Sequence, residues 1–180
     1  MTILRKRNLL IKSGCLYLLF LLGSVNLYSD TGSTQTKSDK AFSKKKFELI
    51  KINGDAVNLK PTPGKLILIN FWATWCAPCR RELPELNLFN DLRKSGKLEV
   101  FAVCINNEPD KIKAFLKDIQ VDFDVVIDKQ ESFADYFKIS QMPTTILLNG
   151  QGQQIFRSAG YSPATIEKLK EKIKQLKESN

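Results

Sequence analysis

Two of the four cysteines, Cys76 and Cys79, are separated only by Ala77 and Pro78. Two thiols at this spacing can form a disulfide, exchange it with another disulfide, or supply half the ligands of a tetrahedral zinc site. An apolar run at residues 66–71 precedes the pair, and a helical pattern of apolar residues begins at Pro78. We therefore expect both cysteines where a buried strand leads into a helix.

A helix N-terminus favours a thiolate, because unpaired backbone N–H groups and the positive end of the helix dipole both face it. Cys76, the first of the two, is therefore the expected nucleophile. Cys79 lies one turn further on, where its thiol can attack a mixed disulfide formed by Cys76 and release the product.

Two other uses of the cysteine pair are weaker interpretations. A zinc site needs two more ligands, but the chain has no histidine, and its other cysteines are Cys15 near the N-terminus and Cys104 in an expected strand. A purely structural disulfide closing so short a loop would add little stability. Redox chemistry is the better interpretation, with no metal, and Cys104 is predicted to be a small buried apolar side chain.

The elements around the pair predict an α/β domain with a mixed central sheet flanked by helices. An Asn-Gly turn at residues 53–54 predicts an N-terminal β-hairpin, and the last two strands form a second hairpin. The expected strands are residues 47–52, 55–59, 66–71, 98–105, 125–127, 144–148 and 154–158, and the expected helices are residues 78–94, 109–119, 131–137 and 163–177.

The net charge of +9 belongs mostly to the N-terminal part of the chain. Residues 1–46 carry nine basic and two acidic side chains, whereas the rest is close to balanced, so a nucleic-acid partner is not expected. Basic residues followed by an uncharged apolar run make residues 1–29 a predicted signal peptide or N-terminal membrane anchor. Residues 30–46 are a predicted flexible linker, and residues 47–180 the folded domain. We expect an exported protein, periplasmic or on the outer face of the cytoplasmic membrane, either tethered or released.

The run from Phe71 to Arg80, FWATWCAPCR, resembles the thioredoxin superfamily, and specifically the TlpA/ResA-like exported thiol-disulfide oxidoreductases. The segment Met142-Pro143-Thr144-Thr145 is similar to the cis-proline segment of that family, and the likeness covers roughly residues 47–177. The resemblance implies a thioredoxin-like fold, with a redox-active Cys76–Cys79 disulfide and no separate cofactor. It also implies a cis Pro143 facing the cysteines, and a substrate-binding surface formed by Trp75, Pro78, Met142 and Pro143.

Asn70 departs from the pattern, because thioredoxins carry a buried aspartate there that helps to deprotonate the second cysteine. An amide cannot accept that proton, so a proton relay through Asn70 needs another base or a water chain. Exported relatives supply a glutamate elsewhere near the site. Glu108, which follows the strand ending at Ile105, is our candidate, with an ordinary solvated loop glutamate as the alternative.

The resemblance predicts a reductant of disulfides in exported proteins, with a role in cytochrome c maturation, because no histidine lies between the cysteines to stabilise the thiolate. The implied partners are protein thiols and disulfides, a membrane thiol reductant that recharges the site, and the membrane itself through the N-terminus. We expect a monomer. The alternative is a peroxiredoxin-like peroxidase or thiol antioxidant, although peroxiredoxins centre on a Thr-x-x-Cys site. A copper-delivery module would need a histidine and a wider cysteine spacing.

Overall fold

The structure is a computed structural model that describes residue 42, residues 46–105 and residues 108–178. All of these belong to one compact unit, Gln35–Asn180. The predicted signal peptide or anchor and most of the predicted linker lie outside the described residues. Among the residues that are described, no helix is both long enough and apolar enough to cross a bilayer.

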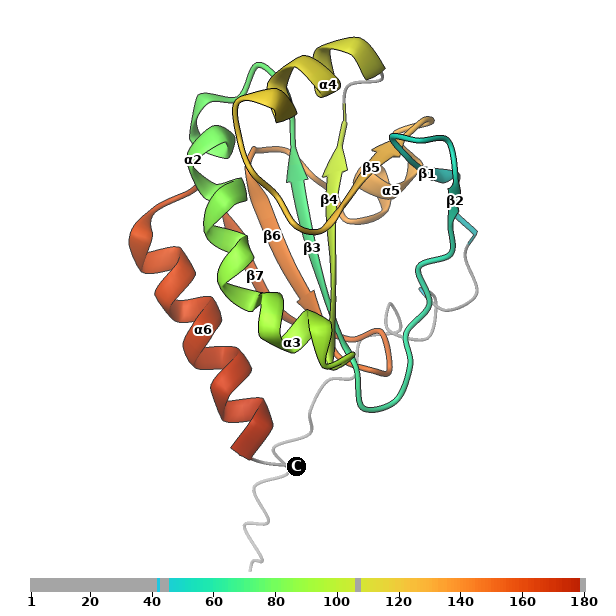
Figure 1. The fold of residues 1–180 in the computed structure, drawn as a ribbon. Helices are drawn as coiled ribbons and strands as arrows, with labels where there is room; N and C mark the ends of the chain where they lie inside the picture. Colours follow the sequence, from blue (N-terminus) through green and yellow to red (C-terminus); the bar gives the residue numbers. More distant parts are fainter. Residues whose placement is uncertain (1–41, 43–45, 106–107, 179–180) are drawn as a thin grey trace, which may run out of the picture. The chain divides into compact units, whose positions relative to one another are not determined.

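A mixed sheet forms the centre of the described domain, with the strand order β2-β1-β5-β4-β3-β6-β7 (Figure 1). Strands β3, β4 and β5 run parallel, and every other pairing is antiparallel. This arrangement confirms the predicted mixed sheet and the N-terminal hairpin. The strands are β1 (Leu49–Lys51), β2 (Ala56–Val57), β3 (Leu66–Trp72), β4 (Leu98–Cys104), β5 (Asp124–Asp128), β6 (Thr144–Leu148) and β7 (Gln154–Ala159).

Strand β3 lies inside the sheet between β4 and β6, and its side chains alternate between two hydrophobic clusters. Leu68 and Trp72 point into one cluster, whereas Ile69 and Phe71 point into the other, and all four are fully buried. Burial on both faces explains why this strand is a nearly continuous apolar run in the sequence.

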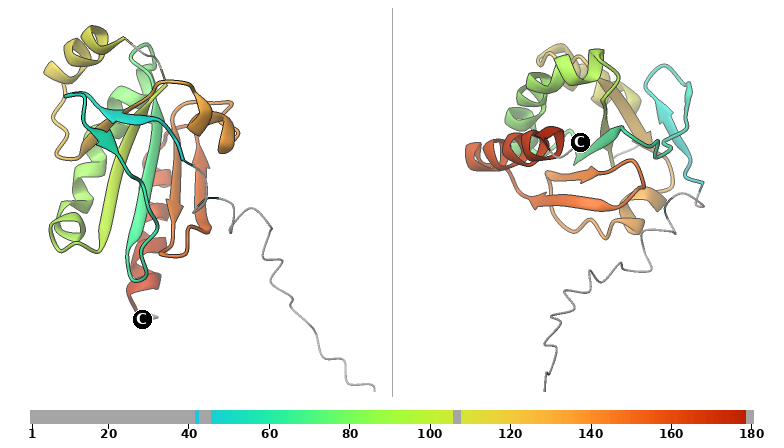
Figure 2. Two further views of the ribbon diagram at one scale, coloured as in Figure 1. Left: turned by 90° about the vertical axis from the view of Figure 1, so that its right-hand side faces the viewer. Right: turned by 90° about the horizontal axis from the view of Figure 1, so that it is seen from below.

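Helices cover both faces of the sheet, as the views in Figures 1 and 2 show. Most of them contribute to the cluster that contains the cysteines, whereas the other face is covered by α5 and by aromatic side chains near the start of the domain. The helices are α2 (Ala77–Glu85), the 3₁₀ turn η1 (Leu86–Phe89), α3 (Asn90–Lys94), α4 (Pro109–Lys117), α5 (Ser132–Tyr136) and α6 (Pro163–Glu178).

The single helix expected over residues 78–94 is wrong, because α2 ends at Glu85 and the chain continues through η1 into α3. Pro84 lies inside α2, and its ring has no N–H to donate to the carbonyl one turn earlier. The lost hydrogen bond and the clash with that carbonyl favour a tighter 3₁₀ turn directly afterwards.

Phe42 belongs to the predicted flexible linker, but its side chain is buried in the folded domain. Its ring is 3% exposed and stacks on Phe47 at a centroid distance of 5.9 Å. It also lies within 6.2 Å of the rings of Phe133, Tyr136 and Phe137. Packing of the domain therefore includes at least one residue that precedes the predicted boundary at Phe47.

Candidate redox site

The two cysteines lie where the sequence predicts, between the end of β3 and the start of α2. Cys76 is the N-cap of α2, and its Sγ accepts a hydrogen bond from the backbone N–H of Cys79 at 3.2 Å. The two sulfurs form a disulfide. No acidic residue lies in the first turn of α2, so no carboxylate there offsets the positive end of the helix dipole at the Cys76 sulfur.

The surroundings of the two sulfurs differ. Cys76 is 4% exposed and follows Trp75, whose side chain is 70% exposed, while Cys79 is completely buried. Pro78 is half-buried in the first turn of α2. The Cys76 side of the pair therefore lies nearer the surface than the Cys79 side.

The segment before β6 also matches its expectation, because the Met142–Pro143 peptide bond is cis. Met142 packs against the hydrophobic cluster that contains Cys76 and Cys79. The carbonyl of the buried Pro143 accepts a hydrogen bond from the N–H of Gly160 at 2.7 Å. The residue that follows β7 therefore holds this segment in place beside the cluster that contains the cysteines.

A buried carboxylate, Glu82, belongs to the site although the sequence analysis did not single it out. Glu82 is completely buried on the same side of α2 as Cys79, one turn further along the helix. Its Oε2 accepts a hydrogen bond from Asn70 Nδ2 at 2.7 Å, and its Oε1 accepts one from Thr145 Oγ1 at 2.8 Å. Asn70 thus occupies the usual aspartate position and holds a carboxylate that a neighbouring helix supplies.

Burial raises the pKa of the Glu82 carboxyl above its ordinary value. The hydrogen bonds from Thr145 and Asn70 act in the opposite direction, and the nearby charge of Glu85 adds to the rise. A carboxyl group whose pKa is raised from the acidic range can accept and return a proton closer to neutral pH than an exposed glutamate.

The helical pattern contained a signal for Glu82. Cys79, Leu83 and Leu86 recur at the spacing of one helix face, and Glu82 lies three residues after Cys79 on that face. A charged residue at a position that the pattern assigns to the core is unusual enough to suggest a functional role.

Glu108, the candidate base from the sequence, lies at the surface and not in the buried group formed by Asn70, Glu82 and Thr145. Its side chain is exposed just before α4, and its carboxylate pairs with Lys111 Nζ at 2.7 Å. The structure brings Asn70 to Glu82 and shows no hydrogen bond between Asn70 and Glu108 among the described residues. Cys104 is completely buried in β4 and takes no part in the disulfide, as expected.

Comparison with known proteins agrees with this geometry. A family model described as Redoxin matches residues 36–173. The chain belongs to the redoxin family. It is 30% identical over 152 residues to the thiol-disulfide oxidoreductase ResA of Bacillus subtilis, which covers 84% of each chain. It is 32% identical over 130 residues to ResA of Halalkalibacterium halodurans, covering 71% of this chain and 73% of that one. The crystal structure of StoA from Bacillus subtilis superposes with a TM-score of 0.59 at 28% identity, over 71% of this chain and 95% of that one.

These relatives and the site identify a ResA-like member of the thioredoxin superfamily. The protein is a thiol-disulfide oxidoreductase. This outcome confirms the family, the fold and the class of enzyme that the Cys76–Cys79 motif predicted.

Arg80 follows the redox pair of this redoxin and lies against α4. Its guanidinium lies 4.4 Å from the ring centroid of Phe115 and pairs with Asp118 at 3.3 Å. The ring of Phe115 in turn contacts the buried Trp72 at the end of β3, with a centroid distance of 4.8 Å and a tilt of 36° between the rings. This layered contact fixes α4 against the strand end from which the redox motif starts.

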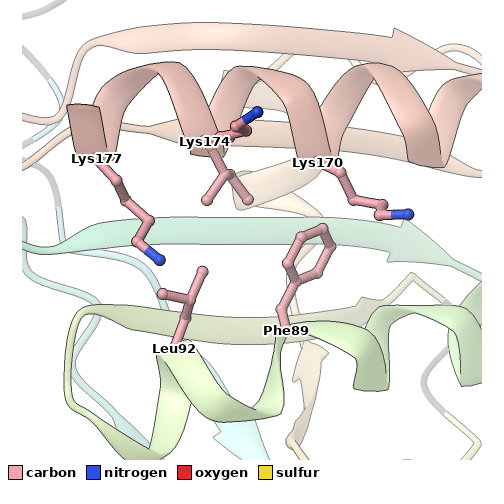
Figure 3. A pocket seen from close by; sticks show the side chains of 6 residues that line it. Phe89, Leu92, Lys170, Lys174 and Lys177 are labelled. Atoms are coloured by element: carbon pink, nitrogen blue, oxygen red, sulfur yellow. The ribbon is translucent and has the colours of Figure 1, made fainter. Parts of the chain in front are cut away.

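A surface groove of about 450 Å³ lies apart from the disulfide, between α6 and the η1–α3 segment (Figure 3). Its apolar floor includes Phe89 and Ile173, which are only 4% and 3% exposed. Lysine side chains of α6 form its rim, and no residue of the redox site lines it. The groove is therefore separate from the redox site.

Proposed function

We propose that this thiol-disulfide oxidoreductase works outside the cytoplasm as a dithiol reductant of exported protein disulfides, with apocytochrome c among its substrates. The observation that carries the proposal is a dithiol at the start of a helix with a buried carboxylate, Glu82, one turn away from the second cysteine. That arrangement supplies a nucleophile, a resolving thiol and a base.

In the first step, the Cys76 thiolate attacks one sulfur of a substrate disulfide. A bond forms between Cys76 Sγ and that sulfur, while the substrate S–S bond breaks and the other substrate sulfur leaves as a thiolate that takes up a proton. The exposed Trp75 and the half-buried Met142 lie around the pair and form the surface on which a substrate peptide docks.

In the second step, Glu82 accepts the proton of the Cys79 thiol, and the resulting thiolate attacks Cys76 Sγ. The Cys76–Cys79 disulfide forms, the mixed disulfide breaks, and the second substrate sulfur leaves and is protonated. Two electrons have then passed from the protein to the substrate. A membrane thiol reductant restores the dithiol by the same exchange in reverse.

The direction of electron flow follows from the charges around the dithiol. A reduced pair is favoured by groups that stabilise its thiolate, and such stabilisation makes a protein a strong oxidant. No histidine lies between Cys76 and Cys79, and an ionised Glu82 beside Cys79 opposes a second negative charge there. The protein is therefore expected to donate electrons.

Export and tethering rest on the sequence of residues 1–46. The basic start, the apolar run and the polar linker would place the domain on the outer side of the membrane, within reach of a membrane reductant. We propose that the domain acts as a monomer, since the disulfide site needs only α2, β3 and β6 of one chain.

The reduction potential of the Cys76–Cys79 pair tests this proposal. We would equilibrate the full chain with glutathione buffers and follow the fraction of disulfide, with Cys76→Ser as the control that cannot form it. The expected potential lies near thioredoxin's value of about −270 mV. A value near about −120 mV, that of a strong oxidant, would mean that the protein makes disulfides and would overturn the reductant assignment.

A further inference from the structure

Thr145 lies between Glu82 and Asn70 in a closed ring of hydrogen bonds. Its Oγ1 donates to Glu82 Oε1 at 2.8 Å and accepts from Asn70 Nδ2 at 2.8 Å. Asn70 Nδ2 also donates to Glu82 Oε2 at 2.7 Å. All three residues are at most 1% exposed, so bulk water does not compete for these hydrogen bonds.

The ring fixes the direction of every hydrogen bond in it. An amide nitrogen can only donate, so Thr145 Oγ1 must accept from Asn70, and its own hydrogen is then directed to Glu82. Both carboxyl oxygens therefore receive hydrogens, which suits an ionised carboxylate. A proton on Glu82 would displace one of the two hydrogen bonds. The ring therefore lowers the pKa of Glu82, whereas burial raises it.

The ring also connects the base to the segment that contacts substrate. Thr145 belongs to β6 and lies opposite Asn70 of β3 in the antiparallel register. Pro143, with its cis peptide bond, precedes Thr145 by two residues. A single hydroxyl thus bridges the helix that carries Cys79 and the strand that follows the proposed docking segment.

We propose that Thr145 is a positioning residue of the redox reaction, whose hydroxyl holds Glu82 oriented and ionised for the step in which Cys79 loses its proton. This inference rests on the proposed function, because it requires Glu82 to be the base. Thr145 itself contacts neither the sulfurs nor the substrate in this role.

The other groups that face Glu82 are few and stay constant in the test. On α2, Glu85 is the charged group that acts on Glu82, and Cys79 lies one turn earlier in the helix; before α6, the hydroxyl of Tyr161 donates a hydrogen bond to Glu85 Oε1. Strands β3 and β6 present the uncharged Asn70 and Thr145. Removing the hydroxyl of Thr145 therefore removes one donor to Glu82 and one acceptor for Asn70, and changes no charge.

The test uses the reduced full chain and dithiobis-nitrobenzoate, which releases one coloured thiolate in each step. The first phase reports attack by Cys76, and the second reports displacement by Cys79. Thr145→Val should move the pH midpoint of the second phase upward by about one to two units, the effect of losing one hydrogen bond to a charged group. The first phase should keep its rate, and Thr145→Ser should restore the midpoint.

Thr144→Val is the matched control, because Thr144 is a buried threonine of the same strand whose hydroxyl donates to the carbonyl of Gln141 instead. An unchanged midpoint in Thr145→Val, or an equal shift in Thr144→Val, would overturn the inference. Thr145→Ala serves for the same comparison if Thr145→Val does not fold. Glu82→Gln tests the base assignment separately. If this variant keeps the wild-type pH profile of the second phase, Glu82 is not the base, and the proposed function fails at that point. If only Thr145→Val gives an unexpected result, the failure is confined to Thr145.

Discussion

Cys76 and Cys79 are chemically identical but lie in different surroundings, because Cys76 is the N-cap of α2 and Cys79 lies within its first turn. Cys76 caps the helix beside the exposed Trp75, whereas Cys79 is sealed in the core one turn from Glu82. The first position favours meeting a substrate, and the second favours a proton transfer that is shielded from solvent. We therefore expect Cys76 to attack first and Cys79 to follow.

Replacing the resolving thiol should trap the substrate. Cys79→Ser keeps the nucleophile but cannot break the mixed disulfide, so covalent adducts with protein disulfides should accumulate. Cys76→Ser, the matched control, should form few adducts because its remaining thiol is completely buried. Non-reducing gels and mass spectrometry would detect the adducts, and equal trapping by both variants would contradict the assignment.

Glu82 should make the domain less stable as the pH rises. Its folded pKa is raised by burial, so the folded state holds the proton more tightly than the unfolded state. The resulting stabilisation is complete below the unfolded pKa, which is about 4.3, and is lost as the pH rises through the folded pKa. Glu82→Gln should remove this loss. Urea unfolding of the oxidised chain at a series of pH values would give the free energy of unfolding as a function of pH. The same pH dependence in Glu82→Gln would show that Glu82 does not cause the loss.

At the scale of elements, short helices depend on side chains that satisfy their first N–H groups. Helix α5 has only five residues, and the buried Asp128 at the end of β5 accepts hydrogen bonds from the N–H groups of Phe133 at 3.0 Å and Ala134 at 2.8 Å. Burial raises the pKa of the Asp128 carboxyl, while these two bonds lower it. Asp128 thus attaches α5 to the sheet on the face opposite the disulfide.

Removing that carboxylate should loosen α5. Asp128→Ala leaves two buried N–H groups without an acceptor, at a cost of about 1–3 kcal/mol in the free energy of unfolding. Asp128→Asn keeps an acceptor oxygen and should cost less. Denaturant unfolding would give the loss of stability, and amide exchange at Phe133 and Ala134 would localise it. Unchanged exchange at these two amides in Asp128→Ala would rule out the capping role.

For the molecule as a whole, two separate clusters stabilise the two faces of the sheet. The cluster on the α2 face contains the cysteines, whereas the opposite cluster is rich in aromatic rings, with Phe133 in contact with Phe42, Phe47, Phe71 and Phe137. The aromatic face carries no redox chemistry and contributes stability. Phe42 extends it beyond the predicted domain start.

Phe42→Ala should therefore destabilise the domain although it lies in a segment whose composition is that of a linker. Loss of a buried phenyl ring costs roughly 3–5 kcal/mol. Leu88→Ala is the control, since Leu88 is 44% exposed and its loss should cost less than about 1 kcal/mol. Thermal or urea unfolding of the oxidised chains would compare them. Equal stabilities of the two variants would show that Phe42 does not belong to the folded domain.

The amino-acid sequence by itself determined the features that depend on neighbouring residues. The apolar run of β3, the helical pattern after Pro78 and the Cys-x-x-Cys spacing are local, so they predicted the junction that carries the thiols. The break at Pro84 was also a local signal, because a proline inside a helix removes a hydrogen bond at a known place.

Only the tertiary structure decided which carboxylate is buried against Asn70. Thr145 and Glu82 are 63 residues apart in the chain, and their hydrogen bond exists because β6 pairs with β3 beneath α2. Asn70 in the sequence indicated only that an expected aspartate was missing, and the sequence pattern suggested Glu108, whereas the carboxylate that contacts Asn70 is Glu82. Which polar groups are buried together depends on how the elements pack, and a linear pattern does not contain that packing.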